Sequence, residues 1–199
     1  MDIAGMDIAG MVQRAKGIVL DPKQEWPVIA AEKAGHAKVL LSWLLPLSLI
    51  PAVAIVIGHG LIGYSVGPVH VASLKLGLRL GLLQIVSTIG VAYLVAFIVN
   101  ALAERYASVK NLDQAFALIA YAYTPACLGG VFQIIPSLAP IGTLVGLYGL
   151  YLLYLGLPPM MQTPPEKNTG YFVVALLCII GVYIVLSAVL AAVFIARMY

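Results

Sequence analysis

The sequence predicts an all-α membrane protein, a polytopic helical bundle of five transmembrane helices preceded by a short cytoplasmic amphipathic helix. Of the 199 residues, 62% are hydrophobic and 10% are charged, with a mean hydropathy of +1.03, whereas a soluble domain is roughly 25% charged. Five apolar runs come near or exceed the roughly 18 residues that let a helix cross about 30 Å of hydrocarbon. They divide the chain into a cytoplasmic segment, residues 1–38, and a membrane domain, residues 39–199. The predicted spans are residues 40–62, 76–103, 114–135, 141–157 and 171–196.

The cytoplasmic segment opens with the pentapeptide MDIAG written twice, which is a duplication, an alternative start or a cloning scar. From Ile8 onward, apolar residues recur at intervals of three and four, with Gln13, Arg14 and Lys16 elsewhere on the helical wheel. This pattern is typical of an amphipathic helix. Because the helix carries two cations and precedes a membrane domain, we expect it to lie at the membrane interface.

A second short helix is predicted directly after the first. Asp21 is followed by Pro22 and, at the third helical position, by Gln24, which together indicate a capped helix start with proline in the first turn. Trp26 and Pro27 come next. A lone tryptophan beside a membrane is more often an interfacial anchor than part of a ligand site. We therefore expect Trp26 and Pro27 to contact lipid or a protein partner.

The first span contains two prolines and ends in a glycine-rich stretch. Pro46 and Pro51 each remove a backbone N–H and are expected to bend the helix. His59 and His70 follow, eleven residues apart, with no nearby carboxylate or thiolate. Two such histidines fall short of a metal site, so we expect no bound metal.

The start of the second span is ambiguous, because leucines alternate with other residues from Leu74 to Leu82. This is a strand period, but a helix is favoured since an unpaired strand in lipid would leave backbone groups unsatisfied. In a helix, Lys75 and Arg79 lie one turn apart. They either extend to the interface beside lipid phosphates or face a wet cavity and bind an anion.

The third and fourth spans form a helical hairpin, because only five residues join them. Pro125 lies in the middle of the third span and leaves the Tyr121 carbonyl without its helical donor, while the Thr124 hydroxyl is placed to bond a freed carbonyl. A kink is expected there. In the fourth span, Gly142 and Gly146 have the spacing that lets another helix approach closely.

A proline-rich loop, residues 158–170, is predicted between the fourth and fifth spans. Pro158 and Pro159 stiffen its start. The segment 163–166 has threonine and glutamate at capping spacing with proline between them, which predicts a single helical turn. Lys167 adds a positive charge on the same side of the membrane.

The distribution of basic residues orients the five spans. With the N-terminus in the cytoplasm, eight basic residues lie inside and three lie outside, which satisfies the positive-inside rule and puts the C-terminus on the opposite side. The inner residues are Arg14, Lys16, Lys23, Lys33, Lys38, Arg105, Lys110 and Lys167, and the outer ones are Lys75, Arg79 and Arg197.

Four motifs together resemble the Ypt-interacting protein (Yip domain) family, in its bacterial, five-span form. They are the segments 21–32, 122–125, 147–157 and 164–171, and the resemblance extends from about Val12 to the end of the fifth span. The resemblance implies a cytoplasmic N-terminus and five spans. Eukaryotic members engage Rab-type GTPases in traffic between endoplasmic reticulum and Golgi, but their long acidic and polar N-terminal region is missing here. The resemblance is therefore to the bacterial branch, which implies an inner membrane protein and no particular reaction.

The favoured functional hypothesis is a non-enzymatic membrane scaffold or adaptor, whose cytoplasmic face binds lipid or a protein partner. Small residues in the spans would also allow several copies to assemble, and nothing indicates nucleic acid. The residues expected at this face are Trp26, Pro27, Pro158, Pro159, Glu166 and Lys167. The alternative is a transporter or channel for a small solute or ion, which would use the proline-broken spans with Lys75 and Arg79.

An intramembrane enzyme is the third hypothesis and has the least support. Hydrolysis needs a nucleophile with a base, a carboxylate pair or a metal at membrane depth. No histidine is expected at the depth of the candidate nucleophiles, which are Ser87, Thr88, Ser187, Cys127 and Cys178. Because phosphate-cradling glycine loops are also missing from the sequence, we expect no cofactor.

Overall fold

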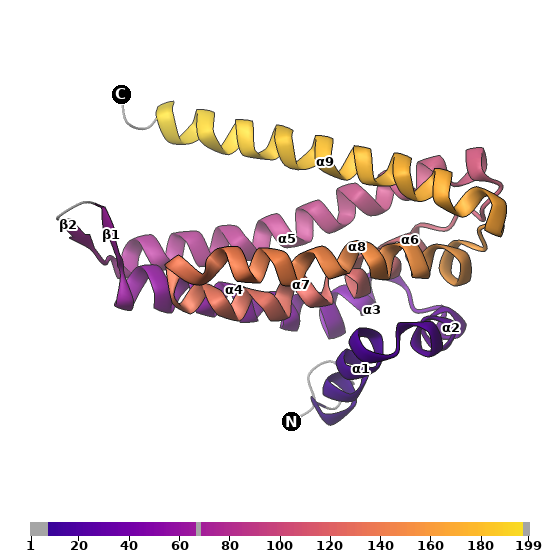
Figure 1. Ribbon diagram of the computed structural model, residues 1–199, viewed down its shortest axis with the longest axis horizontal. Coiled ribbons are helices and arrows are strands. Elements are labelled where there is room, and N and C mark those ends of the chain that lie inside the picture. Colours follow the sequence, from indigo (N-terminus) through magenta and orange to yellow (C-terminus); the bar gives the residue numbers. More distant parts are fainter. Residues whose placement is uncertain (1–7, 67–68, 197–199) are drawn as a thin grey trace.

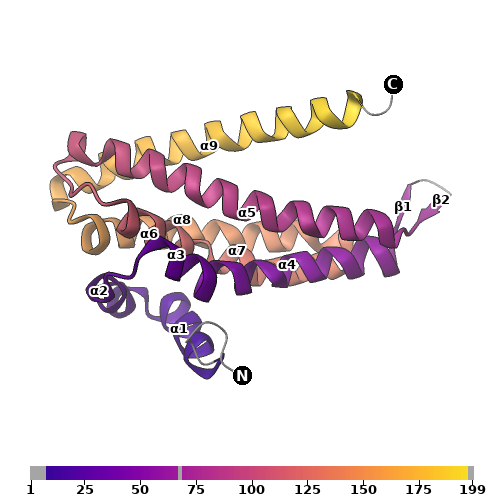
Figure 2. The same cartoon turned by 180° about the vertical axis from the view of Figure 1, so that it is seen from behind.

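The computed structural model describes residues 8–66 and 69–196, so the first copy of the MDIAG repeat and the C-terminal stop at residues 197–199 lie outside the described residues. Five helical segments are long and apolar enough to span a membrane, and they run alongside one another (Figures 1 and 2). They are His36–Ile62, Leu74–Tyr106, Leu112–Ile134, Pro136–Met161 and Pro165–Ala188. The predicted fold class is confirmed. A short β-hairpin lies at one end of the bundle, which we call the hairpin end, and the helix α2 lies near the other, the N-terminal end.

The N-terminal segment folds into two helices, α1 (Ile8–Leu20) and α2 (Pro22–Glu32). The amphipathic helix expected from Ile8 is confirmed, and Ile18 on its apolar face is fully buried. The second helix also starts where proline predicts. The Asp21 side chain makes no capping hydrogen bond, however, and the Asp21 carbonyl instead accepts from the Gln24 amide at 3.2 Å. Backbone geometry alone is therefore enough to start α2.

The first span is a composite of α3 (His36–Val39), a π-helical segment η1 (Leu40–Leu44), α4 (Leu45–Ile57) and a second π-helical segment η2 (Gly58–Ile62). The irregular turn of η1 directly precedes Pro46, where the helical hydrogen bond is lost. Two serines reinforce this region, with Ser42 Oγ and Ser48 Oγ each donating to a backbone carbonyl of the preceding turn at 2.7 Å.

A β-hairpin that the sequence analysis did not anticipate connects the first two spans. Its strands β1 (Tyr64–Val66) and β2 (Val69–Val71) pair antiparallel. The second span then starts with α5 (Leu74–Leu102), which Ser73 caps by accepting from the Leu76 amide, and ends in η3 (Ala103–Tyr106), a 3-10 turn. The strand alternative for Leu74–Leu82 is therefore wrong. In lipid, a helix satisfies its own backbone hydrogen bonds, whereas an unpaired strand does not.

The third span begins with α6 (Leu112–Ala122), where Asn111 Oδ1 accepts from the Gln114 amide at 3.2 Å as predicted. The helix breaks at Tyr123, ahead of Pro125, and continues as α7 (Thr124–Gly129) and η4 (Gly130–Ile134). The expected irregularity is thus a one-residue break at Tyr123, and the Tyr123 amide still donates to the Ile119 carbonyl at 2.9 Å. The Thr124 hydroxyl is not paired with a freed carbonyl as expected; it accepts from Trp43 Nε1 of the first span at 3.3 Å.

The fourth span consists of η5 (Pro136–Leu138) and α8 (Ala139–Met161), which packs on α6 and α7 through its glycines. A Cβ atom at Gly142 would lie 2.4 Å from the Gly129 carbonyl oxygen, and one at Gly149 would lie 2.5 Å from the Ala122 carbonyl oxygen. Real Cβ atoms do not approach backbone so closely. The close-packing role predicted for Gly142 is confirmed, and the seam extends to Gly149.

The predicted loop at residues 158–170 is largely helical, because α8 continues through Pro158 and Pro159 to Met161 and α9 (Pro165–Ala196) starts three residues later. The helical turn predicted at residues 163–166 begins at Pro165 and is the first turn of α9. Pro158 leaves the Tyr154 carbonyl without its helical donor, and Asn168 Nδ2 of α9 donates to that carbonyl at 3.3 Å. A contact between two helices thus replaces the lost bond.

The Asn168 contact makes a direct prediction. Asn168→Asp is expected to lower stability by about 1–3 kcal/mol, because it sets an acceptor against the Tyr154 carbonyl in a buried position. Thermal unfolding in detergent would measure the loss. Thr169→Asp, exposed in the same helical turn, is the control for added charge. Equal melting temperatures of the two variants would contradict the role given to Asn168.

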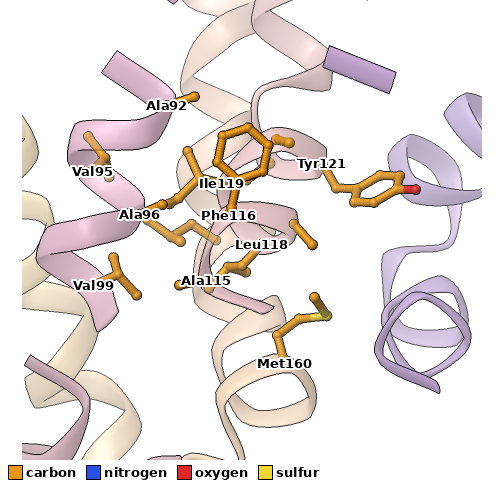
Figure 3. Close-up of a cluster of buried hydrophobic side chains, with 14 of the residues drawn as sticks. Ala92, Val95, Ala96, Val99, Ala115, Phe116, Leu118, Ile119, Tyr121 and Met160 are labelled. Carbon is orange, nitrogen blue, oxygen red and sulfur yellow. The ribbon is translucent and has the colours of Figure 1, made fainter. Parts of the chain in front are cut away.

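The core lies where α5, α6 and α8 meet (Figure 3). Small residues of α5, including Ala92 and Ala96, face α6. The side chain of Phe116, which belongs to α6, fills the space between these two helices. Tyr121 points away from α5 toward the N-terminal helices. The helix α6 is thus enclosed on several sides, which explains why the third span is 72% buried while the fifth is 11% buried.

The last helix, α9, is attached at its start. The Tyr171 hydroxyl donates to the Val99 carbonyl of α5 at 2.5 Å, and its ring stacks on Tyr106 with centroids 4.9 Å apart. Beyond this contact, α9 diverges from α5 toward the hairpin end (Figure 1). Halfway along, Tyr183 Oη lies 2.6 Å from Tyr123 Oη. This divergence creates the space described in the next subsection.

Candidate functional site

Trp26 is buried at the junction between α2 and the membrane domain. Its side chain is 1% exposed and lies against Gly156 of α8, where a Cβ atom would come within 2.7 Å of the indole ring. Its edge meets the Tyr121 ring, with centroids 6.5 Å apart and planes at 80°. The expectation that Trp26 contacts lipid or a partner is therefore wrong, because the sequence does not reveal that a glycine of the fourth span receives the indole.

Polar contacts reinforce this junction. Arg14 Nη2 of α1 donates to Glu32 Oε1 of α2 at 2.5 Å, and Arg14 Nε lies 3.8 Å from Glu25 Oε1. Burial alone would lower the pKa of Arg14, but the Glu32 carboxylate outweighs it and the pKa is raised. Tyr148 Oη of α8 also donates to the Val19 carbonyl at 2.9 Å.

The relative size of these contacts decides what holds the N-terminal helices in place. Partly exposed ion pairs contribute about 0–1 kcal/mol, whereas removing a buried tryptophan side chain costs about 3–5 kcal/mol. The Trp26 contact therefore dominates, and the ion pairs of Arg14 fix the angle between α1 and α2.

The exposed residues at this end form what we call the N-terminal face, which consists of Pro27 and Val28 of α2 with Glu166 and Lys167 of α9. Val28 is 51% exposed. Pro158 and Pro159, which were also expected at the face, lie inside α8 and are partly buried. Of the residues predicted at the cytoplasmic surface, Pro27, Glu166 and Lys167 are thus exposed at this end of the bundle, whereas Pro158 and Pro159 are not.

The cation pair Lys75 and Arg79 lies on the first turns of α5, and both side chains are exposed. Neither lines the two cavities described below. The solute pathway hypothesised around this pair therefore runs through neither of the two cavities, and the extension of both side chains to the interface stays a prediction.

A cavity of about 530 Å³ lies between α5, α7, α8 and α9, beside the glycine seam. Gln84, Gln133 and Thr143 line its part toward the hairpin end, while Val95 and Leu153 are among the apolar residues deeper inside. Its polar groups are therefore concentrated on one side.

A second cavity, of about 390 Å³, adjoins the first, since both are lined by Gln84, Gln133 and the paired tyrosines. His59 also lines it, and its Nδ1 atom is buried without a hydrogen-bond partner. Polar atoms in such positions usually have a partner. No Asp, Glu, Lys or Arg occurs among the described residues that line either cavity.

His59 lines the second cavity together with Ser87 and Thr88. It lies nearer the hairpin end than these hydroxyl groups, because its neighbour Gly60 packs against Leu74 and Gly77 at the start of α5. Thr88 Oγ1 accepts from Gln84 Nε2 at 3.1 Å, so this hydroxyl belongs to a hydrogen-bonded pair within α5. The sequence contained a usable signal that was missed: Gln84 and Gln133 are amides within predicted spans, where polar side chains are costly unless they face the protein interior.

The comparison with known families covers almost all of this structure. A Yip1 domain matches residues 16–189. The protein belongs to the Yip1 domain family. The family resemblance drawn from the sequence motifs is thereby confirmed.

Two similar proteins share the description inner membrane protein YohC, one from Escherichia coli strain K12 and one from Escherichia coli O6:H1 strain CFT073. Each is 29% identical over 161 residues, which are 78% of this chain and 82% of the relative. No solved structure matches the chain. The Yip1 match includes Trp26, Gly156 and the described residues that line both cavities, so these features lie within the family domain.

Proposed function

We propose that this Yip1-family integral membrane protein is a non-enzymatic scaffold of the bacterial inner membrane, and that its N-terminal face binds a protein partner in the cytoplasm. The inner membrane assignment rests on the similarity to YohC. The orientation rests on the count of eight basic residues on the N-terminal side against three on the other.

The observation that carries the proposal is the fixed position of α1 and α2. A surface binds more tightly when it is ordered before the partner arrives, because less conformational entropy is lost on binding. The buried Trp26 and the Arg14 ion pairs provide that order. The N-terminal face also combines an apolar element, Pro27 with Val28, and two charges of opposite sign, a composition typical of the edge of a protein interface.

Photo-crosslinking in native membranes tests this proposal. A photoreactive residue at Pro27 or Glu166, which are exposed, is expected to give a discrete protein adduct of defined mass. The same probe at Ser137, exposed at the hairpin end, is the control and is expected to give none. Lipid adducts or self-adducts alone at Pro27 and Glu166 would contradict the proposal.

A second variant ties the adduct to the fixed position of α2. Gly156→Leu is expected to displace Trp26 and so weaken the adduct at Pro27, because a Cβ atom at this position meets the indole at 2.7 Å. Gly181→Leu is the matched control, since nothing lies within 4 Å of its Cβ position. An undiminished Pro27 adduct in Gly156→Leu would show that the ordered platform is not required.

A further inference from the structure

We infer that the two adjoining cavities between α5, α8 and α9 bind one neutral lipid, with its polar group toward the hairpin end and its apolar chain toward the N-terminal end. The ligand class is an uncharged amphiphile that carries a carbonyl or hydroxyl group. This inference is independent of the partner proposed for the N-terminal face.

The location of the cavities limits what can enter them. Their lining residues lie within the membrane-spanning segments. Gln84 is ten residues from the start of α5, so it lies about 15 Å along the helix from that end. A molecule that reaches Gln84 must therefore be soluble in the bilayer.

The direction of the ligand follows from the distribution of polar groups. Amides and the imidazole lie toward the hairpin end, at Gln84, Gln133 and His59, whereas the opposite part of the larger cavity is lined by Val95, Leu153 and other aliphatic side chains. A lipid has the same division into a polar end and an apolar chain. The volume of about 530 Å³ in the larger cavity is within the range of ligand pockets, roughly 300–1,000 Å³.

The absence of charge among the described lining residues selects an uncharged polar group. A phosphate placed beside Gln84 and Gln133 would be removed from water without a cation to pair with, which is costly. The exposed cations Lys75 and Arg79 line neither cavity and so provide no such partner there. A carbonyl or hydroxyl group instead needs only hydrogen bonds, which the amide groups can donate or accept and which His59 Nδ1, buried without a partner, can complete.

The hydroxyl pair of Tyr123 and Tyr183, with oxygens 2.6 Å apart, lies where the two cavities meet, because both tyrosines line both cavities. This bond joins α9 to the rest of the bundle beyond the attachment at Tyr171. Breaking it would let the diverging half of α9 move away from α5, which opens a path for the lipid from the bilayer.

Two kinds of membrane lipid share this chemistry, a diacylglycerol and a prenylquinone. The test uses the full chain in vesicles of phosphatidylethanolamine and phosphatidylglycerol. Diazirine derivatives of a diacylglycerol, a prenylquinone and phosphatidylglycerol are added in separate samples, and labelled residues are mapped by mass spectrometry. Labelling by one neutral probe identifies the source, and labelling by both indicates shared recognition. Labels on α5, α8 or α9 from a neutral probe, but not from phosphatidylglycerol, are the expected result.

Two variants on α8 separate cavity binding from general lipid contact. Leu150→Trp adds an indole where Leu150 lines the cavity and is expected to reduce neutral-lipid labelling about tenfold. Leu144→Trp, at a residue that is 67% exposed and lines neither cavity, is expected to leave it unchanged. The two variants should have equal melting temperatures, which shows that the loss is not due to unfolding.

Removal of polar groups tests the assigned direction. Gln133→Leu keeps the side-chain size and is expected to weaken labelling by roughly three- to tenfold, as the loss of one hydrogen bond predicts. Equal labelling by phosphatidylglycerol, unchanged labelling in Leu150→Trp, or no labelling by either neutral probe would overturn the inference. So would efficient crosslinks between Ile180 residues of two copies, because they would place a second chain in the cavity.

Discussion

Replacing Trp26 by alanine is expected to release α1 and α2 from the membrane domain. The indole is 1% exposed and packs between Gly156 and Tyr121, and truncation of a buried tryptophan typically costs about 3–5 kcal/mol. The Arg14 ion pairs join α1 to α2, so the contacts that remain with the membrane domain are the buried side chains of Ile18 and Ile29 and one hydrogen bond from Tyr148. The hydrogen bond contributes about 1 kcal/mol and each isoleucine about 1.5–3 kcal/mol, so loss of the indole removes the largest single contact of the two helices.

Limited trypsin digestion in detergent would detect the release. Lys33 follows α2 in a left-handed conformation, with φ of 45°, and is exposed. Cleavage there and at Lys23 within α2 should become much faster in Trp26→Ala, while the membrane domain stays intact. Val28→Ala, on the exposed side of the same helix, is the control. If Trp26→Ala and Val28→Ala are cleaved at the same rate, Trp26 does not anchor α2.

Replacing Gly149 by leucine is expected to cause a large loss of stability in the membrane domain. A Cβ atom at this position would lie 2.5 Å from the Ala122 carbonyl oxygen, which is backbone and cannot rotate away. Leucine gains about 0.8 kcal/mol of helix propensity over glycine, but overpacking against a rigid neighbour costs about 3 kcal/mol or more. The steric term is larger, so α8 must move away from α6.

Gly90 of α5 provides the matched control, because nothing lies within 4 Å of its Cβ position. Gly90→Leu should leave the melting temperature unchanged or raise it slightly, since only helix propensity changes. Gly149→Leu should lower it by roughly 10 °C for a chain of this size. Similar melting temperatures for both variants would mean that α8 and α6 tolerate separation, and that the glycine seam does not set their distance.

Within the seam, the sequence could identify Gly142 and Gly146 but not their partners. The small-residue spacing within one helix is visible in the sequence, and it correctly predicts close packing. Gly142 faces Gly129, whereas a Cβ atom at Gly146 would make only an ordinary contact, 3.4 Å from Ala126 Cβ. Which glycine bears the closest approach depends on the crossing of two helices, and that geometry is not encoded in the spacing.

The residues of the candidate sites also divide into those whose place the sequence could predict and those whose place depends on how the helices pack. Pro27, Glu166 and Lys167 are exposed at the N-terminal end. The exposure of the two charged residues follows from the sequence, because burying an unpaired charge is costly. Trp26 is as compatible with an interface as with a core, and only the position of Gly156 decides between them. The amides Gln84 and Gln133 belong to different spans, and their common cavity could not be predicted from either span alone.

By itself, the sequence determined the five spans, the amphipathic helix α1 and the cap of α6 by Asn111, because these depend on local conditions. Hydrocarbon requires each apolar segment of sufficient length to satisfy its backbone hydrogen bonds internally, which leaves a helix as the outcome. Only the tertiary structure decided where Trp26 lies, how α9 diverges and which polar side chains share a cavity. Tyr123 and Tyr183 are 60 residues apart in the chain. Their contact depends on the rotation and tilt of the third span and of α9, which are set by packing against neighbouring helices rather than by the pattern within either one.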